Sequence, residues 1–427
     1  MDLMAHVGMG VRRYKRGICW YFGERLVELY LQFGYGMMEH CRFLISQWQG
    51  GTAILSPRDL NGEQLLRLSS SIGGLPNGRV LLDPQFYLPH SDHERLCSHD
   101  YWPKDYQTND FWQGQAFANL IDNIADLNRS LGCQEMILPG LHADSVNDDW
   151  LETQRAAVEE GLARSNGLPV LATIALSADA TRSEAQIARL LEVSEKWSPH
   201  GYYIVCEHPN GKYLVDDPNW LANVIDLAAG FKLRGAKVII GYCNHQMLIS
   251  ALAKADAIAS GTWMNVRSFP PDKFRGAYDE EIKQRTTWYY CPQALSEYKI
   301  PFLDIANRQG VLSLMSPPPS FDGGFATPLF GGAQPTTVGF SEQLAFRHYL
   351  HCLRVQTQEA TKASFDETVA HHRTMLDEAR QLLTMLQTSG VRGQLRDFAD
   401  IIDVNEAAMA VLLTTRGAML RRRWASL

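Results

Sequence analysis

Polar side chains that can exchange protons follow several apolar runs of the sequence, at points where a parallel strand would end. Asp83 follows the run 79–82 and precedes Pro84, which cannot continue a central strand because proline has no N–H to donate. The other residues of this kind, each after a later apolar run, are Asp144, Ser177, Glu207 and His208. Carboxylates and imidazoles gathered in one pocket can take up and release protons during a reaction. Loops also begin with such residues for ordinary turn reasons, and for Asp83 the two interpretations weigh equally.

Residues 238–267 are the most informative segment. An apolar run at 238–240 ends in Gly241 and a polar turn, a helix-period stretch follows at 246–254, and a second short apolar run ends in Ser260. Strand, turn, helix and strand in this order form the repeating unit of a parallel α/β protein. The polar residues just past the expected strand ends are Asn244, His245, Ser260, Thr262, Asn265 and Arg267. Because ligands bind outside the carboxyl ends of parallel strands, we expect this segment to hold part of a site.

Apolar runs alternate with helical periodicity from about residue 42 onward. The expected strands are residues 52–56, 79–83, 135–138, 169–174, 201–205, 237–240 and 255–259. Their continuous Val, Ile and Leu character is typical of strands buried on both faces of a parallel sheet. The repeats predict an α/β fold, a (β/α)8 TIM-like barrel, which takes about 250 residues. A doubly wound open sheet is the alternative, and the absence of a dinucleotide or phosphate-binding glycine motif disfavours it.

The segments outside this alternation suggest the remaining organisation. We divide the chain into an N-terminal extension (1–40), the barrel core (41–270), a loop-rich connection (271–340) and a helical subdomain (341–427). Strong helical periodicity near 341–359, 363–388 and 395–415 predicts that the last part is a C-terminal helical subdomain packed against the barrel. Gly390 and Gly393 mark the main break between its helices.

Composition excludes several classes of protein. Apolar residues make up 45% and charged residues 20% of the 427 positions, which is typical of a globular chain, and the net charge of −7 gives no overall basic excess for nucleic acid. The eight cysteines are widely spaced, so neither a disulfide framework nor a local zinc motif is expected. No run of 18 apolar residues occurs. We therefore expect a cytoplasmic protein with reduced cysteines and no membrane span.

Four parts of the chain carry a family resemblance. They are residues 79–83, residues 168–205 with their two expected strands, residues 241–260, and residues 345–353 together with His371 and His372. Together they resemble the tRNA-guanine transglycosylase superfamily, including its DNA-modifying branch. The resemblance implies a (β/α)8 barrel and a pentosyltransferase that exchanges guanine for a 7-deazaguanine in DNA or tRNA. Its partners would be the nucleic acid and a purine or 7-deazaguanine base, and it implies a homodimer or a partner subunit.

Base exchange sets chemical requirements for the site. Breaking the C–N glycosidic bond passes through an oxocarbenium-like state, which needs one carboxylate near the anomeric carbon and another group for the proton on the departing base. The resemblance implies that Asp83 recognises the base or serves as the acid and base. The candidate substrate-binding residues are Asp144, Ser177, Glu207, His208, His245, Ser260, Trp263 and Arg267. Trp263, with Tyr87 and Trp102, is a candidate for stacking on a base, and Arg267 for contacting a phosphate.

The sequence departs from the family pattern in two places. The position that matches the nucleophilic aspartate is Ala259, which cannot attack an anomeric carbon. Either another carboxylate substitutes, or the alignment shifts to Asp256, or the chain is inactive; we therefore take Asp256 as the second candidate catalytic residue. The family's three zinc-binding cysteines are also missing, which leaves His371 and His372 without thiolate partners. We expect no family-type zinc and no other cofactor.

Three hypotheses about function follow. The first is a transglycosylase-like enzyme that acts on guanine in DNA or RNA. The second is a catalytically degenerate paralogue that binds nucleic acid or a partner subunit, which Ala259 and the missing cysteines favour. The third is an unrelated barrel enzyme that acts on a small metabolite.

Overall fold

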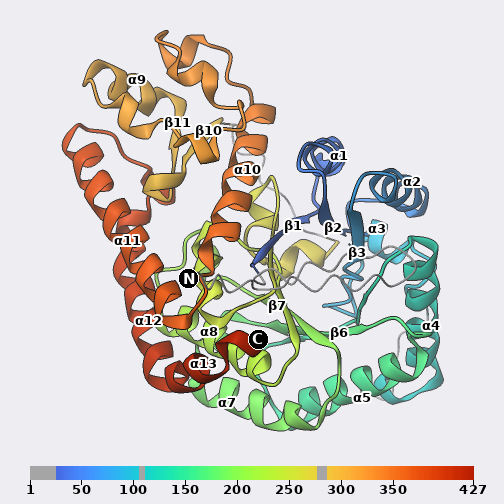
Figure 1. Cartoon of the computed structure of the whole chain (residues 1–427). Helices are drawn as coiled ribbons and strands as arrows, with labels where there is room; N and C mark the ends of the chain where they lie inside the picture. The colour runs from blue at the N-terminus through green and yellow to red at the C-terminus, as the bar shows by residue number, and fades with distance from the viewer. Residues whose placement is uncertain (1–25, 105–110, 277–285) are drawn as a thin grey trace, which may run out of the picture.

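The computed structural model describes residues 26–104, 111–276 and 286–427. Within these residues a curled sheet lies in the lower part of the molecule, with helices around it, and a smaller lobe stands at the upper left (Figure 1). The chain colours in Figure 1 show that residues from the beginning and from the middle of the chain meet in this sheet.

The main sheet is parallel throughout its described strands. Its strands are β1 (Glu28–Gln32), β2 (Gly51–Leu55), β3 (Gly78–Leu82), β4 (Met136–Ile137), β5 (His142–Ala143), β6 (Val170–Leu176), β7 (Gly201–Cys206), β8 (Lys237–Ile240) and β9 (Ala257–Ser260). They lie in the order β3-β2-β1-β9-β8-β7-β6-β4, and β5 also pairs with β6. Because β9 pairs with β1, the first and last strands are neighbours, and the sheet curls with its open seam between β3 and β4. The fold is therefore the predicted α/β, TIM-like type.

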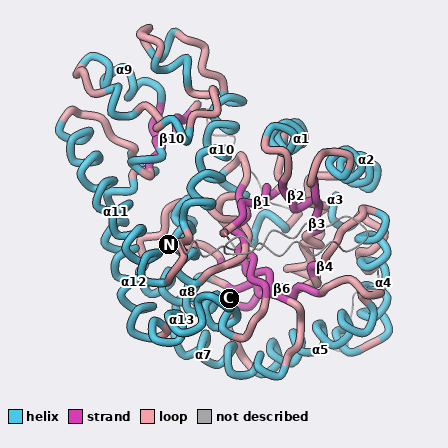
Figure 2. The backbone as a smooth tube through the Cα atoms, viewed as in Figure 1, coloured by secondary structure: helices cyan, strands magenta, loops and turns pink. Residues whose placement is uncertain are grey.

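Helices connect the strands and cover the outside of the sheet (Figure 2). They are α1 (Met37–Gln47), α2 (Gly62–Gly73), α3 (Glu94–Cys97), α4 (Gln115–Ser130), α5 (Asp148–Arg164), α6 (Ala178–Arg182), α7 (Glu184–Val193) and α8 (Pro218–Leu233). Between β8 and β9 the sequence predicts an α-helix, but the chain forms the 3₁₀ segment η4 (His245–Ala253). Asn244 caps its start, and Lys254, in the left-handed conformation, ends it.

The N-terminal boundary of the barrel differs from the one that the sequence suggests. Residues 1–40 were expected to precede the barrel, yet β1 lies among them and pairs with β2 on one side and β9 on the other. The barrel therefore begins no later than residue 28, while residues 1–25 lie outside the described part of the chain. The run 28–32 has only five residues and an exposed first position, so its local pattern is weak, and its role depends on pairing with β9, more than 220 residues later.

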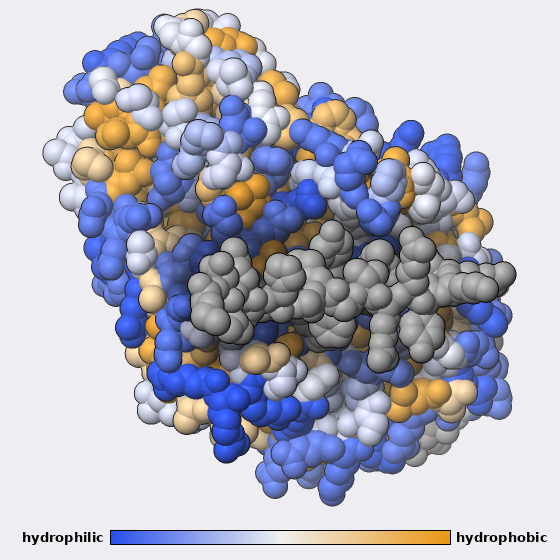
Figure 3. Space-filling view, viewed as in Figure 1, coloured by the Kyte–Doolittle hydropathy of each residue, from blue (hydrophilic) through white to orange (hydrophobic). Residues whose placement is uncertain are grey.

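The lobe and the helical subdomain come from the C-terminal part of the chain. Residues 286–340 form the hairpin β10 (Trp288–Cys291) and β11 (Ser296–Lys299), helix α9 (Ile300–Arg308) and several 3₁₀ turns. The helices after them are α10 (Glu342–Ala360), α11 (Phe365–Thr388), α12 (Ile402–Thr415) and α13 (Gly417–Arg423). On the face drawn in Figure 3, hydrophobic residues gather mainly at the upper left, where α9 and the hairpin lie in Figure 1.

A helix cap and a glycine define the ends of α11, and packing with one ion pair holds the helical subdomain on the barrel. A capping box at Ser364 starts α11, and Gly390, with φ 77°, follows its end as the sequence predicts. Helix α12 packs along α8, and the Arg416 guanidinium donates two hydrogen bonds, of 2.8 and 2.9 Å, to the Asp226 carboxylate of α8. No helix in the described ranges is long and apolar enough to cross a membrane.

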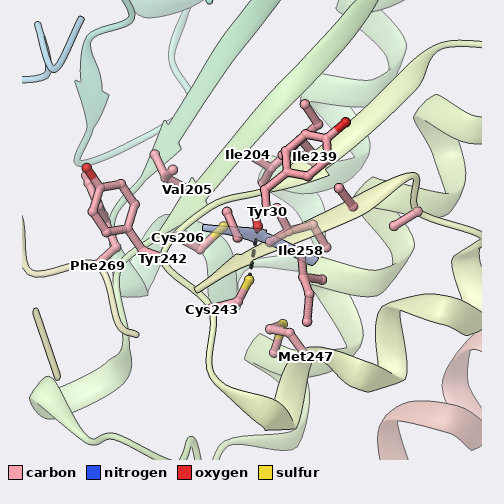
Figure 4. Packing of buried hydrophobic residues seen from close by; sticks show 14 of the residues in the cluster. Tyr30, Ile204, Val205, Cys206, Ile239, Tyr242, Cys243, Met247, Ile258 and Phe269 are labelled. Atoms are coloured by element: carbon pink, nitrogen blue, oxygen red, sulfur yellow. Dashed lines mark hydrogen bonds between the residues drawn. The ribbon is translucent and has the colours of Figure 1, made fainter. Parts of the chain in front are cut away.

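The interior of the barrel is packed with large apolar and aromatic side chains (Figure 4). In Figure 4 the Tyr242 and Phe269 rings lie side by side, with their centroids 5.2 Å apart. Gly201, at the start of β7, allows the neighbouring strand to approach, because a Cβ atom there would lie 2.5 Å from the Lys237 carbonyl oxygen and 2.8 Å from Leu171. A filled interior with close strand contacts positions the polar groups at the strand ends.

We predict that Gly201→Ala lowers the free energy of unfolding by about 1–3 kcal/mol, because the new methyl group overlaps backbone that cannot move without breaking the β7–β8 ladder. Chemical denaturation would measure the change. Gly62→Ala is the matched control: a Cβ there meets nothing within 4 Å, so stability should stay within about 0.5 kcal/mol or rise. Equal effects of the two variants would contradict this account of the packing.

Candidate functional site at the barrel mouth

Asp83 stands directly after β3, as the sequence predicts, and its carboxylate is the centre of a buried cluster. The Tyr87 hydroxyl donates to both carboxylate oxygens at 2.9 and 2.8 Å, the Tyr242 hydroxyl donates at 2.9 Å, and the Gln85 N–H donates at 2.9 Å. The Tyr203 hydroxyl lies at 3.4 Å. Only 1% of Asp83 is exposed, and burial raises the pKa of its carboxyl group although these hydrogen bonds act in the opposite direction. We call Asp83, Tyr87, Tyr203 and Tyr242 the Asp83 cluster.

Neighbouring strands extend this cluster across the mouth of the barrel. The Tyr203 hydroxyl donates at 3.0 Å to the amide oxygen of Gln32, which ends β1. The Lys273 ammonium lies 4.0 Å from the centre of the Tyr242 ring, and its charge lowers the pKa of Asp83 by less than burial raises it. A carboxyl group that keeps its proton to a higher pH, among phenol hydroxyls and near one cation, can give and take a proton.

A second group of side chains lies at the ends of β5, β6 and β7. The His142 ring, whose side chain is 7% exposed, has its Nδ1 3.8 Å from an Asp144 carboxylate oxygen and its Nε2 3.9 Å from a Glu207 carboxylate oxygen. Ser177 Oγ donates to the Asp144 carbonyl oxygen at 3.2 Å and accepts from the Ala180 N–H at 3.1 Å. Burial lowers the pKa of His142 and raises that of Glu207.

Three of the residues singled out from the sequence, Asp144, Ser177 and Glu207, thus do come together. Their surroundings differ, however: the Asp144 side chain is 98% exposed, whereas Ser177 caps helix α6 and is buried. The sequence analysis missed His142, because the two-residue strand β5 is too short to show as an apolar run.

His208 and His245 are buried and occupy structural positions. Nδ1 of His208 lies 2.9 Å from the Lys212 carbonyl oxygen, and its ring packs edge-on against Trp220. The His245 ring lies among aromatic rings, 4.9 Å from Tyr290 between centroids. Burial lowers the pKa of each histidine to about 4, so both rings are neutral at pH 7. Trp102, a candidate for stacking on a base, instead packs inside the core against Phe86.

A third group follows β9 and includes a buried ion network. The Arg267 guanidinium, in a residue 2% exposed, donates to Glu297 at 3.2 Å and to the Gly261 carbonyl oxygen at 2.8 Å. Arg396 donates to the same Glu297 oxygen at 2.8 Å. Burial alone would raise the pKa of Glu297, but Arg396 and Arg267 outweigh it and lower the pKa to about 2. Glu297 is therefore ionised, and it comes from the region that the sequence suggested to be a loop-rich connection.

A small pocket of about 50 Å³, partly open to solvent, lies beside this network. Its walls come from the segment after β9, from the hairpin β10–β11, from α10 and from Arg396. We call it the β9 pocket. Trp263 and Arg267, both singled out from the sequence, line it. Ser260 ends β9, two residues before the pocket-lining Thr262, and is fully buried.

The end of β9 lacks a carboxylate. Ala259 is fully buried and pairs in register with Tyr30 of β1. Asp256 was proposed as a replacement catalytic residue, but it precedes β9 and so lies at the amino end of the strand, opposite the barrel mouth. Its carboxylate accepts hydrogen bonds from Lys232 Nζ at 2.9 Å and from the Val238 N–H at 2.7 Å. Because successive parallel strands direct their carboxyl ends to one rim, Asp256 and Asp83 stand at opposite ends of the barrel.

Potential metal ligands do not gather in the described ranges, where no group of three or more His, Cys, Asp or Glu side chains could hold a metal ion. The rings of His371 and His372 lie 5.8 Å apart on α11, and His372 is buried. The absence of a family-type zinc site and of any other cofactor stays a prediction.

Comparisons with known proteins leave the family unassigned. No protein-family model matches the chain, and no curated protein matches it. A solved structure that is similar in part is the carboxyl transferase domain of Rhizobium etli pyruvate carboxylase with 3-bromopyruvate. The two share 11% sequence identity and a TM-score of 0.34, over 92% of this chain and 78% of that one. A likeness at this level supports no conclusion about activity.

We predict that Asp256→Asn lowers the free energy of unfolding by about 3 kcal/mol, because it leaves the Lys232 ammonium, whose side chain is 3% exposed, without its anionic partner. Urea denaturation at pH 7 would measure the loss. Asp148→Asn, which removes a 90% exposed partner of Arg189, should change stability by less than about 0.5 kcal/mol. Wild-type stability in the Asp256 variant would contradict the structural role.

We predict that stability falls in mild acid because of His245 and His372, which line one cavity between η4 and α11. Burial lowers their pKa values to about 4 and about 3, whereas an unfolded histidine has a pKa near 6.5. The stabilisation that comes from keeping the two rings neutral is complete above pH 6.5 and is lost as pH falls towards the folded-state pKa values. By pH 5 each histidine has lowered the free energy of unfolding by about 2 kcal/mol.

Thermal or urea unfolding at pH 7 and pH 5 would measure this loss. The double variant His245→Gln/His372→Gln should lose less stability over the same interval, because its cavity no longer contains a titrating ring. Equal losses in the variant and the wild type would contradict the assignment.

Proposed function

We propose that this protein binds a nucleobase at the mouth of its barrel and exchanges guanine in DNA or tRNA for a 7-deazaguanine, as a transglycosylase-like transferase. The observation that carries the proposal is Asp83, a carboxyl group at the carboxyl end of a barrel strand whose burial raises its pKa. Buried carboxyl groups with perturbed pKa values at such strand ends are typical of sites that move protons. The family resemblance of the sequence suggests which reaction the proton transfer serves.

The chemistry assigned to Asp83 follows from the bond that breaks. When the C–N glycosidic bond of guanosine opens, its electron pair stays on the departing base, which needs a proton. Protonated Asp83 can supply it, and the resulting carboxylate can take a proton from the incoming base. The hydroxyls of Tyr87 and Tyr242 stabilise that carboxylate between the two steps, because they already donate to it at 2.8–2.9 Å.

Position 259 limits the form that this exchange can take. Alanine offers no lone pair, and the sequence holds no carboxylate between positions 257 and 271, so no covalent glycosyl intermediate forms at the end of β9. In the proposed reaction the base departs and its replacement arrives without a covalent bond between the sugar and a residue of this strand.

A second candidate function is a catalytically degenerate paralogue that binds nucleic acid or a partner subunit, which Ala259 favours. In that case the Asp83 cluster is a structural network. The two candidates differ in what replacing Asp83 should do.

We predict that Asp83→Asn lowers the rate of exchange by about 10²–10⁴-fold, because an amide cannot act as general acid or base. Incorporation of labelled guanine into guanine-containing DNA and into tRNA would measure the rate. Protein stability should fall by about 1–3 kcal/mol, because an asparagine amide has one oxygen where both carboxylate oxygens of Asp83 accept hydrogen bonds from buried donors. The rates are therefore compared at a temperature at which circular dichroism shows the variant to be folded.

The matched control is Asp100→Asn, an exposed aspartate in the following loop, which should keep the wild-type rate. If neither the wild type nor an Ala259→Asp variant incorporates label into either polymer, the enzymatic proposal is wrong. If both lack activity but the wild type binds one of the polymers with a steep salt dependence, the second candidate is supported.

A further inference from the structure

Residues 269–276 cover the Asp83 cluster at the mouth of the barrel, and we call them the mouth segment. They come after β9 and contain the 3₁₀ turn η6 (Pro271–Phe274). Phe269, Lys273 and Phe274 are each at most 2% exposed. The segment therefore turns two aromatic rings and one ammonium group towards the cluster.

The two phenylalanines of the mouth segment pack on the tyrosines that donate to Asp83. The centroid of the Phe269 ring lies 5.0 Å from that of Tyr87 and 5.2 Å from that of Tyr242, whose ring is beside it in Figure 4. The centroid of the Phe274 ring also lies 5.0 Å from that of Tyr87. Tyr87 and Asp83 are each 1% exposed under this cover. A substrate therefore cannot touch the Asp83 carboxyl group while the segment stays in place.

The mouth segment lies outside the strands of the sheet. It begins at an isolated bridge between Phe269 and Glu207. Further along, the Lys273 N–H donates within the segment, to the Pro270 carbonyl oxygen at 3.2 Å. Because the segment is a turn and not a rung of the barrel, it can move without breaking the pairing of the strands.

Hydrogen bonds that involve side chains tie the segment to the loops after β2 and β3. Arg58 Nε donates to the Lys273 carbonyl oxygen at 2.7 Å, and the Ser91 hydroxyl donates to the Phe274 carbonyl oxygen. A single hydrogen bond of this kind contributes about 0.5–1.5 kcal/mol, so each can open while the barrel stays folded.

The Lys273 ammonium group favours opening. It lies 4.0 Å from the centre of the Tyr242 ring and donates to the Asn265 carbonyl oxygen at 2.6 Å. Burying an ammonium group costs hydration free energy, which a return to water restores. The same movement brings the Asp83 carboxyl group into contact with solvent.

We propose that the mouth segment is a closed gate over Asp83, and that a substrate reaches this carboxyl group only after residues 270–276 have moved outward. The rate of any reaction at Asp83 then depends on the fraction of molecules in the open form. The need for a substrate to reach Asp83 rests on the proposed function, whereas the movement can be measured on the chain alone.

A reversible disulfide tests the movement. A Cβ atom on Gly276 would lie 2.9 Å from Asp92 Cγ, close to where the sulfur of a cysteine at position 92 would stand. Asp92→Cys/Gly276→Cys can therefore form a disulfide that fastens the end of the segment to the loop after β3. The variant also carries Cys97→Ser, because Cys97 Sγ lies 3.2 Å from the Ser91 carbonyl oxygen, next to the new cysteine. Peptide mapping verifies the bond.

Carbodiimide coupling of an amine to carboxyl groups, followed by mass spectrometry of the peptides, measures access to Asp83 in the oxidised and the reduced form of this variant. We expect Asp83 to be labelled at least about tenfold more slowly in the oxidised form, because only open molecules expose its carboxyl group. Asp144, whose side chain is 98% exposed, is the internal control and should be labelled equally in both forms. Equal labelling of Asp83 in the two forms, or no labelling of it in the reduced form, would overturn the proposal.

Ser91→Ala loosens the closed position without a new covalent bond. It removes the donor to the Phe274 carbonyl oxygen, so Asp83 should be labelled about two- to tenfold faster than in the wild type. Ser98→Ala is the matched control: this hydroxyl donates to the Arg95 carbonyl oxygen of its own helix, and labelling should stay at the wild-type rate. A wild-type rate in the Ser91 variant would contradict the gate.

The measurements separate the gate from the proposed function. If the oxidised variant exchanges guanine only after reduction, both proposals are supported. If labelling shows the gate but the wild type exchanges no base, the proposed function alone is wrong. If the oxidised form exchanges guanine as fast as the reduced form, the gate alone is wrong.

Discussion

The pairing of β1 with β9 is the interaction on which the rest of the structure depends. It brings the first strand beside the last one, and the parallel sheet between them must then curl. In a curled parallel sheet the carboxyl ends of all strands point to one rim, so Gln32 and Asp83 both reach the Tyr203 hydroxyl although they are far apart in the sequence. Gly201, at the amino end of β7, lets β7 and β8 pack closely at the opposite end of the barrel.

Two buried carboxyl groups at this rim have opposite electrostatic surroundings. Asp83 is met by phenol and amide donors, and burial raises its pKa. Glu297 is met by Arg267 and Arg396, which lower its pKa to about 2 against the effect of burial. In the proposed function Asp83 moves the proton. Glu297 stays ionised between its two arginines and takes no part in that step.

C-terminal segments supply most of the walls of the β9 pocket. Glu297 comes from the hairpin, Tyr349 from α10, and Arg396 from the segment between α11 and α12, while Arg267 follows β9. The lobe and the helical subdomain thus complete a wall of the site. Ala259 leaves the strand that ends at this wall without a nucleophile, so the chemistry that the family resemblance implies must here rely on Asp83 or be absent.

The sequence by itself determined the elements, because apolar runs and helical periodicity are local properties. It predicted the TIM-like fold, the strand that ends at Asp83, and the long helices after residue 341, and it placed Trp263 and Arg267 at the rim of a site. Only the tertiary structure decided that residues 28–32 form a barrel strand, that Asp256 lies at the opposite end from Asp83, and that Glu297 joins the rim. These features depend on contacts between residues far apart in the chain, and no pattern within a short window specifies such contacts.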